Sequence, residues 1–139
     1  MVVAILKIIS INQIADKSLV KEFLFYLEYA KRCEPYSTYS PSWWDDNSKA
    51  KDPKNDIAAL QKLIIGGKKS LVNAKSEFIR QRYIFQLIRL AFNSGDYQGC
   101  IDEFNSNEKE FSNNSSIKYR SLGYTAGAYY KLKEYGEAN

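Results

Sequence analysis

The 139-residue sequence contains no histidine, and this absence removes several kinds of catalytic site. Histidine is the usual general base near neutral pH, the usual activator of a nucleophilic serine or cysteine, and a frequent zinc ligand. No spacing of nucleophile and base, of paired carboxylates or of metal ligands takes its place. We therefore expect a protein that is not an enzyme and that needs no cofactor and no metal.

Cysteine is almost as scarce as histidine. Cys33 and Cys100 are the only two cysteines, and they stand so far apart in the sequence that they form no Cys-x-x-Cys redox or metal motif. Free cysteine is among the residue types that are most often buried in folded proteins. We interpret the two as buried small side chains, with a disulfide between them as the alternative.

The sequence has neither a large excess of one charge nor an apolar run that could span a bilayer. Twenty basic and sixteen acidic residues give a net charge of +4, a mild bias that requires no anionic partner. The apolar residues 1–13 are too few to span a bilayer and lack the basic start and cleavage site of a signal peptide. We expect them to form a packed helix, or a strand, within a single domain of residues 1–139. The compartment is left open, with the cytoplasm as the default.

Proline occurs only three times, always within residues 34–56, and the rest of the sequence has the apolar spacing of helices. The segment 34–56 is rich in proline, serine and aspartate, and we predict a long loop there. The fold class that we predict is all-α, an antiparallel array of helix hairpins with about five to seven helices. The predicted helices include residues 18–33, 57–65 (capped by Asp56 and ended by Gly66 and Gly67), 76–94, 97–111 and 117–133.

The segment 76–94 is the strongest of these helices, and it is apolar almost all round. A helix of this kind has neighbours on most of its sides. Its one polar stripe contains Arg82, Gln86 and Arg89, followed by Asn93. These side chains could line a concave groove and hold a carboxylate or phosphate by forked hydrogen bonds. The alternative is that the two arginines pair with acids on a neighbouring helix or are simply solvated.

A short pattern occurs twice in the C-terminal half. A shift of 38 residues (133 minus 95) aligns Gly95-Asp96-Tyr97 with Lys133-Glu134-Tyr135. The same shift aligns Cys100 with Ala138, so a small residue follows each tyrosine by three positions. Phe104 lies one helical turn after Cys100. Each copy therefore predicts a helix, a tight turn and a second helix.

This pattern, over about residues 76–139, resembles the tetratricopeptide repeat. The resemblance implies an α-solenoid fragment built from antiparallel helix pairs, in which Tyr97 and Tyr135 lie between helices. It also implies that Cys100 and Ala138 lie where helices cross closely. The sequence departs from the family in its longer spacing and in lacking the closing proline, and a plain helical bundle is the alternative. Since one repeat cannot bury its apolar face alone, we expect the array to continue in a longer chain or to be covered by a partner or a second copy.

The family resemblance implies a scaffold that binds a protein or peptide, with polar contacts from Arg82, Gln86 and Arg89. Trp43 and Trp44 in the predicted loop are further candidates, because exposed tryptophans often anchor a partner. The alternative is that one of them packs on the helices. A weaker hypothesis is nucleic-acid binding by the basic residues between 68 and 82, which are loosely clustered and lack a recognition motif. A third is a purely structural segment of a larger protein.

Overall fold

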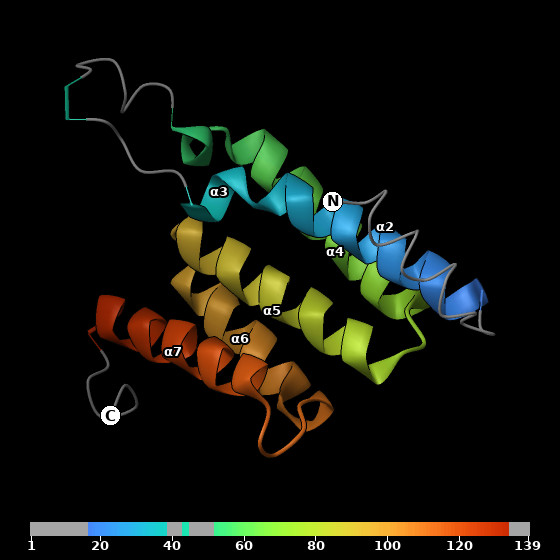
Figure 1. The fold of residues 1–139 in the computed structure, drawn as a ribbon. Helices are drawn as coiled ribbons and strands as arrows, with labels where there is room; N and C mark the ends of the chain where they lie inside the picture. The colour runs from blue at the N-terminus through green and yellow to red at the C-terminus, as the bar shows by residue number, and fades with distance from the viewer. Residues whose placement is uncertain (1–16, 39–42, 45–51, 134–139) are drawn as a thin grey trace.

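The computed structural model describes residues 17–38, 43–44 and 52–133, and within these ranges the chain forms helices and no β-strand (Figure 1). The prediction of an all-α fold is therefore confirmed. The predictions for residues 1–13, Tyr135 and Ala138 lie outside the described residues. The elements are α2 (Lys17–Cys33), α3 (Pro35–Thr38), η1 (Pro53–Asn55), α4 (Ile57–Asn73), α5 (Glu77–Asn93), α6 (Tyr97–Asn107), η2 (Glu108–Glu110) and α7 (Ser116–Lys131).

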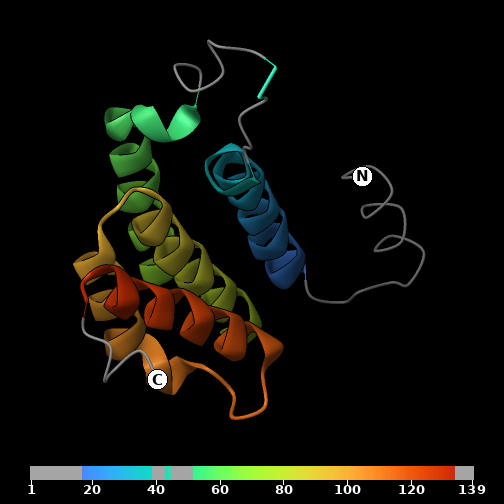
Figure 2. The same cartoon turned by 90° about the vertical axis from the view of Figure 1, so that its left-hand side faces the viewer.

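Helix α5 is the centre of the described fold. It packs against α2, α3, α4, α6 and α7, as expected for a helix that is apolar on most of its surface. Figures 1 and 2 both show α2 and α6 on opposite sides of α5. Ten of its residues are buried. The most completely enclosed of them are Ile79, Ile84, Leu87, Ile88 and Leu90.

Helix α2 is joined to α5 by polar contacts at one end and by aromatic rings in the middle. The Glu22 carboxylate accepts hydrogen bonds from the backbone N–H groups of Lys75 and Ser76, at 3.1 and 2.9 Å. It thereby satisfies donors at the start of α5, where Ser76 makes no side-chain cap of its own. Farther along, the rings of Tyr26 and Tyr29 lie 5.2 and 5.3 Å from the ring of Tyr83. These contacts fix how α2 lies against α5.

Helix α4 does not end at Gly66 and Gly67, and the prediction of a short helix over 57–65 is wrong. The helix continues to Asn73. Its start is as predicted, because Asp56 accepts a hydrogen bond from the Ala59 N–H at 3.0 Å. Glycine in a helix costs only about 1 kcal/mol relative to alanine. The packing of α4 against α5 outweighs this cost.

The segment 34–56 is not wholly a loop, because helical turns begin at two of its prolines. Helix α3 starts at Pro35 and η1 starts at Pro53. Proline suits the first position of a helix, where its fixed backbone angle is already correct and its missing N–H is not needed. Asp52 caps η1 by accepting a hydrogen bond from the Lys54 N–H at 2.9 Å. Reading every proline as a helix breaker therefore underestimated the helical content.

The turn between α5 and α6 has the chemistry that its sequence predicts. Gly95 has φ = 82°, a left-handed conformation that glycine adopts without strain. Asp96 then caps α6 by accepting a hydrogen bond from the Gly99 N–H at 2.8 Å. Tyr97 is half-buried against the core, and its ring lies 5.5 Å from that of Phe92. Cys100 and Phe104 are buried on the inner face of α6.

The end of α7 repeats two of the hydrogen bonds at the end of α5. At the end of α5 the N–H groups of Ser94 and Gly95 donate to the carbonyls of Leu90 and Phe92. At the end of α7 the corresponding bonds, 38 residues later, run from Leu132 to Ala128 and from Lys133 to Tyr130. Lys133 also has a positive φ, of 63°, although it is not glycine. The two aligned positions therefore share one backbone geometry.

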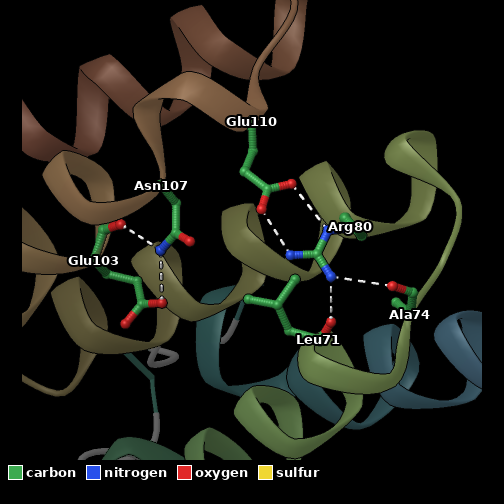
Figure 3. A network of polar contacts seen from close by, with 6 residues as sticks. All are labelled: Leu71, Ala74, Arg80, Glu103, Asn107 and Glu110. Atoms are coloured by element: carbon green, nitrogen blue, oxygen red, sulfur yellow. Dashed lines mark hydrogen bonds and ion pairs between the residues drawn. The ribbon is translucent and has the colours of Figure 1, made fainter.

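Arg80 ties three elements together (Figure 3). Its Nε and Nη2 atoms donate to the two carboxylate oxygens of Glu110, the last residue of η2, at 2.9 and 2.7 Å. Its Nη1 atom donates to the carbonyls of Leu71 and Ala74, at the end of α4, at 2.8 and 3.0 Å. The guanidinium therefore donates to carbonyls at the end of α4 while forming a bidentate ion pair.

Both cysteines are free and fully buried, Cys33 at the end of α2 and Cys100 in α6. Burial raises the pKa of the Cys33 thiol to about 11 and that of the Cys100 thiol to about 12. Only the thiolate reacts, so at pH 8 about one molecule in 10³ or fewer is reactive at either site. We expect iodoacetamide to alkylate the native protein at least ~100-fold more slowly than the urea-unfolded protein, measured by mass spectrometry. Rapid labelling of either thiol before unfolding would contradict the described packing.

Candidate functional site

A cavity of about 430 Å³ lies between the outer sides of α5 and α7. Its size falls within the range of small ligand or side-chain pockets. Phe85, Arg89 and Phe92 lie on one side of α5, at steps of four and three residues. Arg120, Gly123 and Tyr124 lie on one side of α7, at steps of three and one. The cavity therefore exists because α7 packs along α5.

Aromatic rings form the walls of this cavity. The Tyr124 ring lies 6.0 Å from that of Phe85 and 5.4 Å from that of Phe92, in edge-to-face arrangements. A Cβ atom at Gly127 would lie 3.1 Å from the Phe92 ring, so this glycine lets α7 approach α5 closely. A Cβ atom at Gly123 would meet nothing within 4 Å. Gly123 therefore leaves space open and does not serve a close approach of the helices.

Arg89 is held in place by a buried chain of hydrogen bonds that reaches α2. Its Nη2 atom donates to the Gln86 Oε1 atom at 2.6 Å, and the Gln86 Nε2 atom donates to the Tyr26 hydroxyl at 3.3 Å. Gln86 is only 5% exposed. Burial raises the pKa of Tyr26, while the hydrogen bond from Gln86 and the charges of Arg82 and Arg89 oppose that rise. Tyr26 therefore stays a neutral hydroxyl that can orient Gln86.

One donor of Arg89 has no partner within the described structure. The Nε atom is buried and makes no hydrogen bond. A buried donor without an acceptor costs about 1–3 kcal/mol. Arg120 contributes a second guanidinium to the same cavity, and none of the described lining residues is acidic. The site thus combines two positive charges and three rings, a setting that favours an anionic group attached to an apolar body.

The structure separates the three residues that we had grouped as a polar stripe. Arg89 lines the cavity, whereas Gln86 is buried beneath α2 and reaches the cavity only through Arg89. Arg82 lies outside the cavity, with its guanidinium 3.3 Å from the centre of the Phe78 ring and a hydrogen bond to the Phe78 carbonyl at 3.0 Å. Of the three, only Arg89 is placed to touch a ligand here.

The two tryptophan side chains are almost fully exposed. Trp43 is 92% exposed and Trp44 is 89% exposed, and their rings lie 5.8 Å apart. The alternative in which one of them packs on the helices is therefore not what the described structure shows. Neither residue lines the cavity between α5 and α7.

The basic residues between 68 and 82 do not form one patch. Lys68 forms an ion pair with Glu103 at 3.3 Å, and Arg80 forms one with Glu110 at 2.7 Å. Arg82 is stacked on Phe78. Positive charge that is already paired attracts phosphate groups less strongly.

Two searches of the described residues bear on other kinds of site. They contain no helix that is both long enough and apolar enough to cross a bilayer. Within the same residues no three side chains of the metal-binding types lie close enough together to hold an ion.

Sequence reasoning missed most of this site. Arg120 and Tyr124 share a face of α7, four residues apart, and this spacing was visible in the sequence. What the sequence did not reveal is which face of α7 meets α5, and therefore that these residues lie beside Phe85 and Arg89. Comparison with known proteins does not indicate a function for this site, because no family model, no curated protein and no solved structure matches this chain.

Proposed function

We propose that this chain is a non-enzymatic scaffold of the tetratricopeptide-like type, which binds a peptide segment of a partner protein between α5 and α7. The observation that supports this most is the cavity that contains Arg89, Arg120 and three aromatic rings. An aspartate or glutamate side chain, or a terminal carboxylate, would accept hydrogen bonds from the two guanidiniums. An apolar neighbour in the peptide would pack against the rings.

The outer face of α7 supports a related part of the proposal, that further helices or a partner extend the array. Tyr119, Leu122 and Tyr130 project from α7 and are exposed. Exposed apolar side chains at helical spacing are typical of surfaces that another element covers. Further repeats, another protein or a second copy of this chain would each bury them.

The two other hypotheses have less support. Nucleic-acid binding would need the basic residues between 68 and 82 to act together, and two of them are paired with Glu103 and Glu110. A purely structural role does not account for two arginines and three aromatic rings gathered at one cavity. For these reasons we do not propose either one.

We predict that acidic, partly apolar peptides bind and that this binding needs Arg89 and Arg120. The measurement is selection from a displayed peptide library, followed by fluorescence anisotropy with the selected peptides. The double variant R89Q/R120Q is expected to weaken binding at least ~10-fold, because each charge-assisted hydrogen bond contributes about 1.5–3 kcal/mol. The matched control is R82Q, which removes an arginine of the same helix outside the cavity and is expected to bind like the wild type.

Two results would count against this proposal. Selected peptides that have no acidic residue, and that still bind when their terminal carboxylate is amidated, would remove the role of the guanidiniums. Equal losses of binding in R82Q and R89Q/R120Q would show that general charge, and not the cavity, attracts the peptide. A salt series separates the same possibilities, since exposed charges are screened more strongly than partly buried ones.

A further inference from the structure

A second cavity, of about 570 Å³, lies on the opposite side of the molecule from α7. It forms where the end of α2, the short helix α3, the turn η1 and the helix α4 meet, and its volume suits a small organic ligand. Most of its surface comes from rings, prolines and aliphatic groups. The residues that line it are Tyr29, Arg32, Pro35, Tyr36, Pro53, Ala59, Lys62, Leu63 and Gly66.

Gly66 borders this cavity and has no packing reason to be glycine. It lies within α4, where glycine costs about 1 kcal/mol relative to alanine. A Cβ atom built on it would meet nothing within 4 Å, and its φ is not in the left-handed region. Its neighbour Gly67 differs, because a Cβ atom there would overlap the Tyr29 ring. The absence of a side chain at Gly66 has one visible result, which is that the cavity stays open along the α4 backbone.

The charged groups at this cavity have a single sign. Arg32 and Lys62 line it, and none of the described lining residues is acidic. Neither cation forms an ion pair with another described residue. The Tyr29 hydroxyl donates to the Leu63 carbonyl at 2.9 Å, so Tyr29 presents its ring rather than a free hydroxyl. The Arg32 guanidinium lies 5.8 Å from the centre of the Tyr29 ring. An apolar cavity with two cations that form no ion pair among the described residues matches a ligand that has an apolar body and a negative charge.

We propose that this cavity binds a small, flat aromatic acid. The ring of the ligand lies along the α4 backbone at Gly66, between the tyrosine rings and the prolines. Its carboxylate faces Arg32 and Lys62. This site is separate from the peptide site between α5 and α7 and does not depend on it.

The test uses 2-naphthoate as the probe and 2-naphthylmethanol as its neutral counterpart, with the full chain titrated by NMR. At about 0.3 kcal/mol per non-hydrogen atom, naphthoate should bind with a Kd on the order of 1 mM or tighter. Amide shifts are expected in α3, around Pro53 and along α4 near Gly66. The neutral counterpart is expected to bind at least ~10-fold more weakly, which corresponds to the loss of one charge-assisted contact.

Two variants locate the site. G66L fills the cavity and is expected to abolish naphthoate binding, whereas the matched variant G123L fills the other cavity and is expected to leave it unchanged. R32Q/K62Q changes only exposed side chains, so it folds even if G66L does not, and it is expected to lower affinity at least ~10-fold. The proposal is overturned if naphthoate shows no saturable binding, or if the neutral counterpart binds equally well. It is also overturned if R32Q/K62Q binds naphthoate like the wild type, or if G123L loses binding while G66L keeps it.

Discussion

Replacing Gly67 with alanine is expected to destabilise the protein by about 2–4 kcal/mol, whereas the same replacement at Gly66 is expected to stabilise it by up to about 1 kcal/mol. The two residues are neighbours in α4, and both substitutions raise helix propensity equally. They differ in what the new methyl group meets. At Gly67 it would lie 2.7 Å from Tyr29 Cζ and 3.0 Å from Leu87 Cδ2, whereas at Gly66 it would meet nothing within 4 Å.

Tyr29 cannot easily move out of the way of a methyl group at Gly67. Its ring is buried, and its hydroxyl donates to the Leu63 carbonyl, so displacing it leaves the hydroxyl donor without its partner. Leu87 is fully enclosed on α5 and has no free space either. Urea unfolding of the wild type, G66A and G67A measures both effects. The same sign of change in the two variants would mean that α4 does not pack on α2 and α5 as described.

Replacing Arg80 with alanine is expected to lower the free energy of unfolding by about 2–3 kcal/mol. The substitution removes a bidentate ion pair with Glu110 and two hydrogen bonds to the carbonyls of Leu71 and Ala74. Hydrogen bonds to charged groups contribute about 1.5–3 kcal/mol when buried, and partial exposure of the two side chains, at 24% and 32%, reduces the sum. The matched control R82A removes an arginine that stacks on Phe78 and forms no ion pair with another described residue, and a change below about 1 kcal/mol is expected for it.

The pH dependence of stability gives this ion pair a signature of its own. The hydrogen bonds from Arg80 hold the pKa of Glu110 below its ordinary value of 4.5. A carboxyl group whose pKa is lowered in the folded state contributes stability above its unfolded pKa, and that contribution is lost as the pH falls through the folded value. The difference in the free energy of unfolding between wild type and R80A is therefore expected to be full above about pH 5 and to shrink at lower pH. The difference between wild type and E110Q is expected to shrink in the same way. If the difference stays constant down to pH 2, the stabilisation by Arg80 comes from its hydrogen bonds to the α4 carbonyls and not from its ion pair with Glu110.

The sequence was sufficient to predict the fold class and the central helix. Apolar residues on most faces of the helix between 76 and 94 require neighbours on several sides, and α5 has them. Local chemistry likewise predicted the cap at Asp56. The two glycines of α4 were misread because propensity is a weak term, and only the position of Tyr29 in space distinguishes Gly67 from Gly66.

The candidate site was harder to predict from the sequence than the fold. Spacing placed Arg82, Gln86 and Arg89 on one stripe, but it could not indicate that α2 covers the middle of that stripe. The hydroxyl of Tyr26, sixty residues earlier in the chain, is what makes Gln86 a buried residue. The contribution of Arg120 depends in the same way on how α7 lies on α5. Side chains from distant segments come into contact only in the folded protein, and the spacing of residues in a single sequence does not show which of them do.

The tyrosines of α2 give the two cavities a common element. Tyr26 is linked through Gln86 to Arg89 at one cavity, while Tyr29 lines the other, and both rings touch Tyr83. If occupancy of one cavity shifts α2, the affinity of the other changes with it. Thermodynamic reciprocity then fixes the converse, because the factor by which the first ligand alters binding of the second must equal the factor in the opposite direction. Two ligands that never meet would in that case regulate one another.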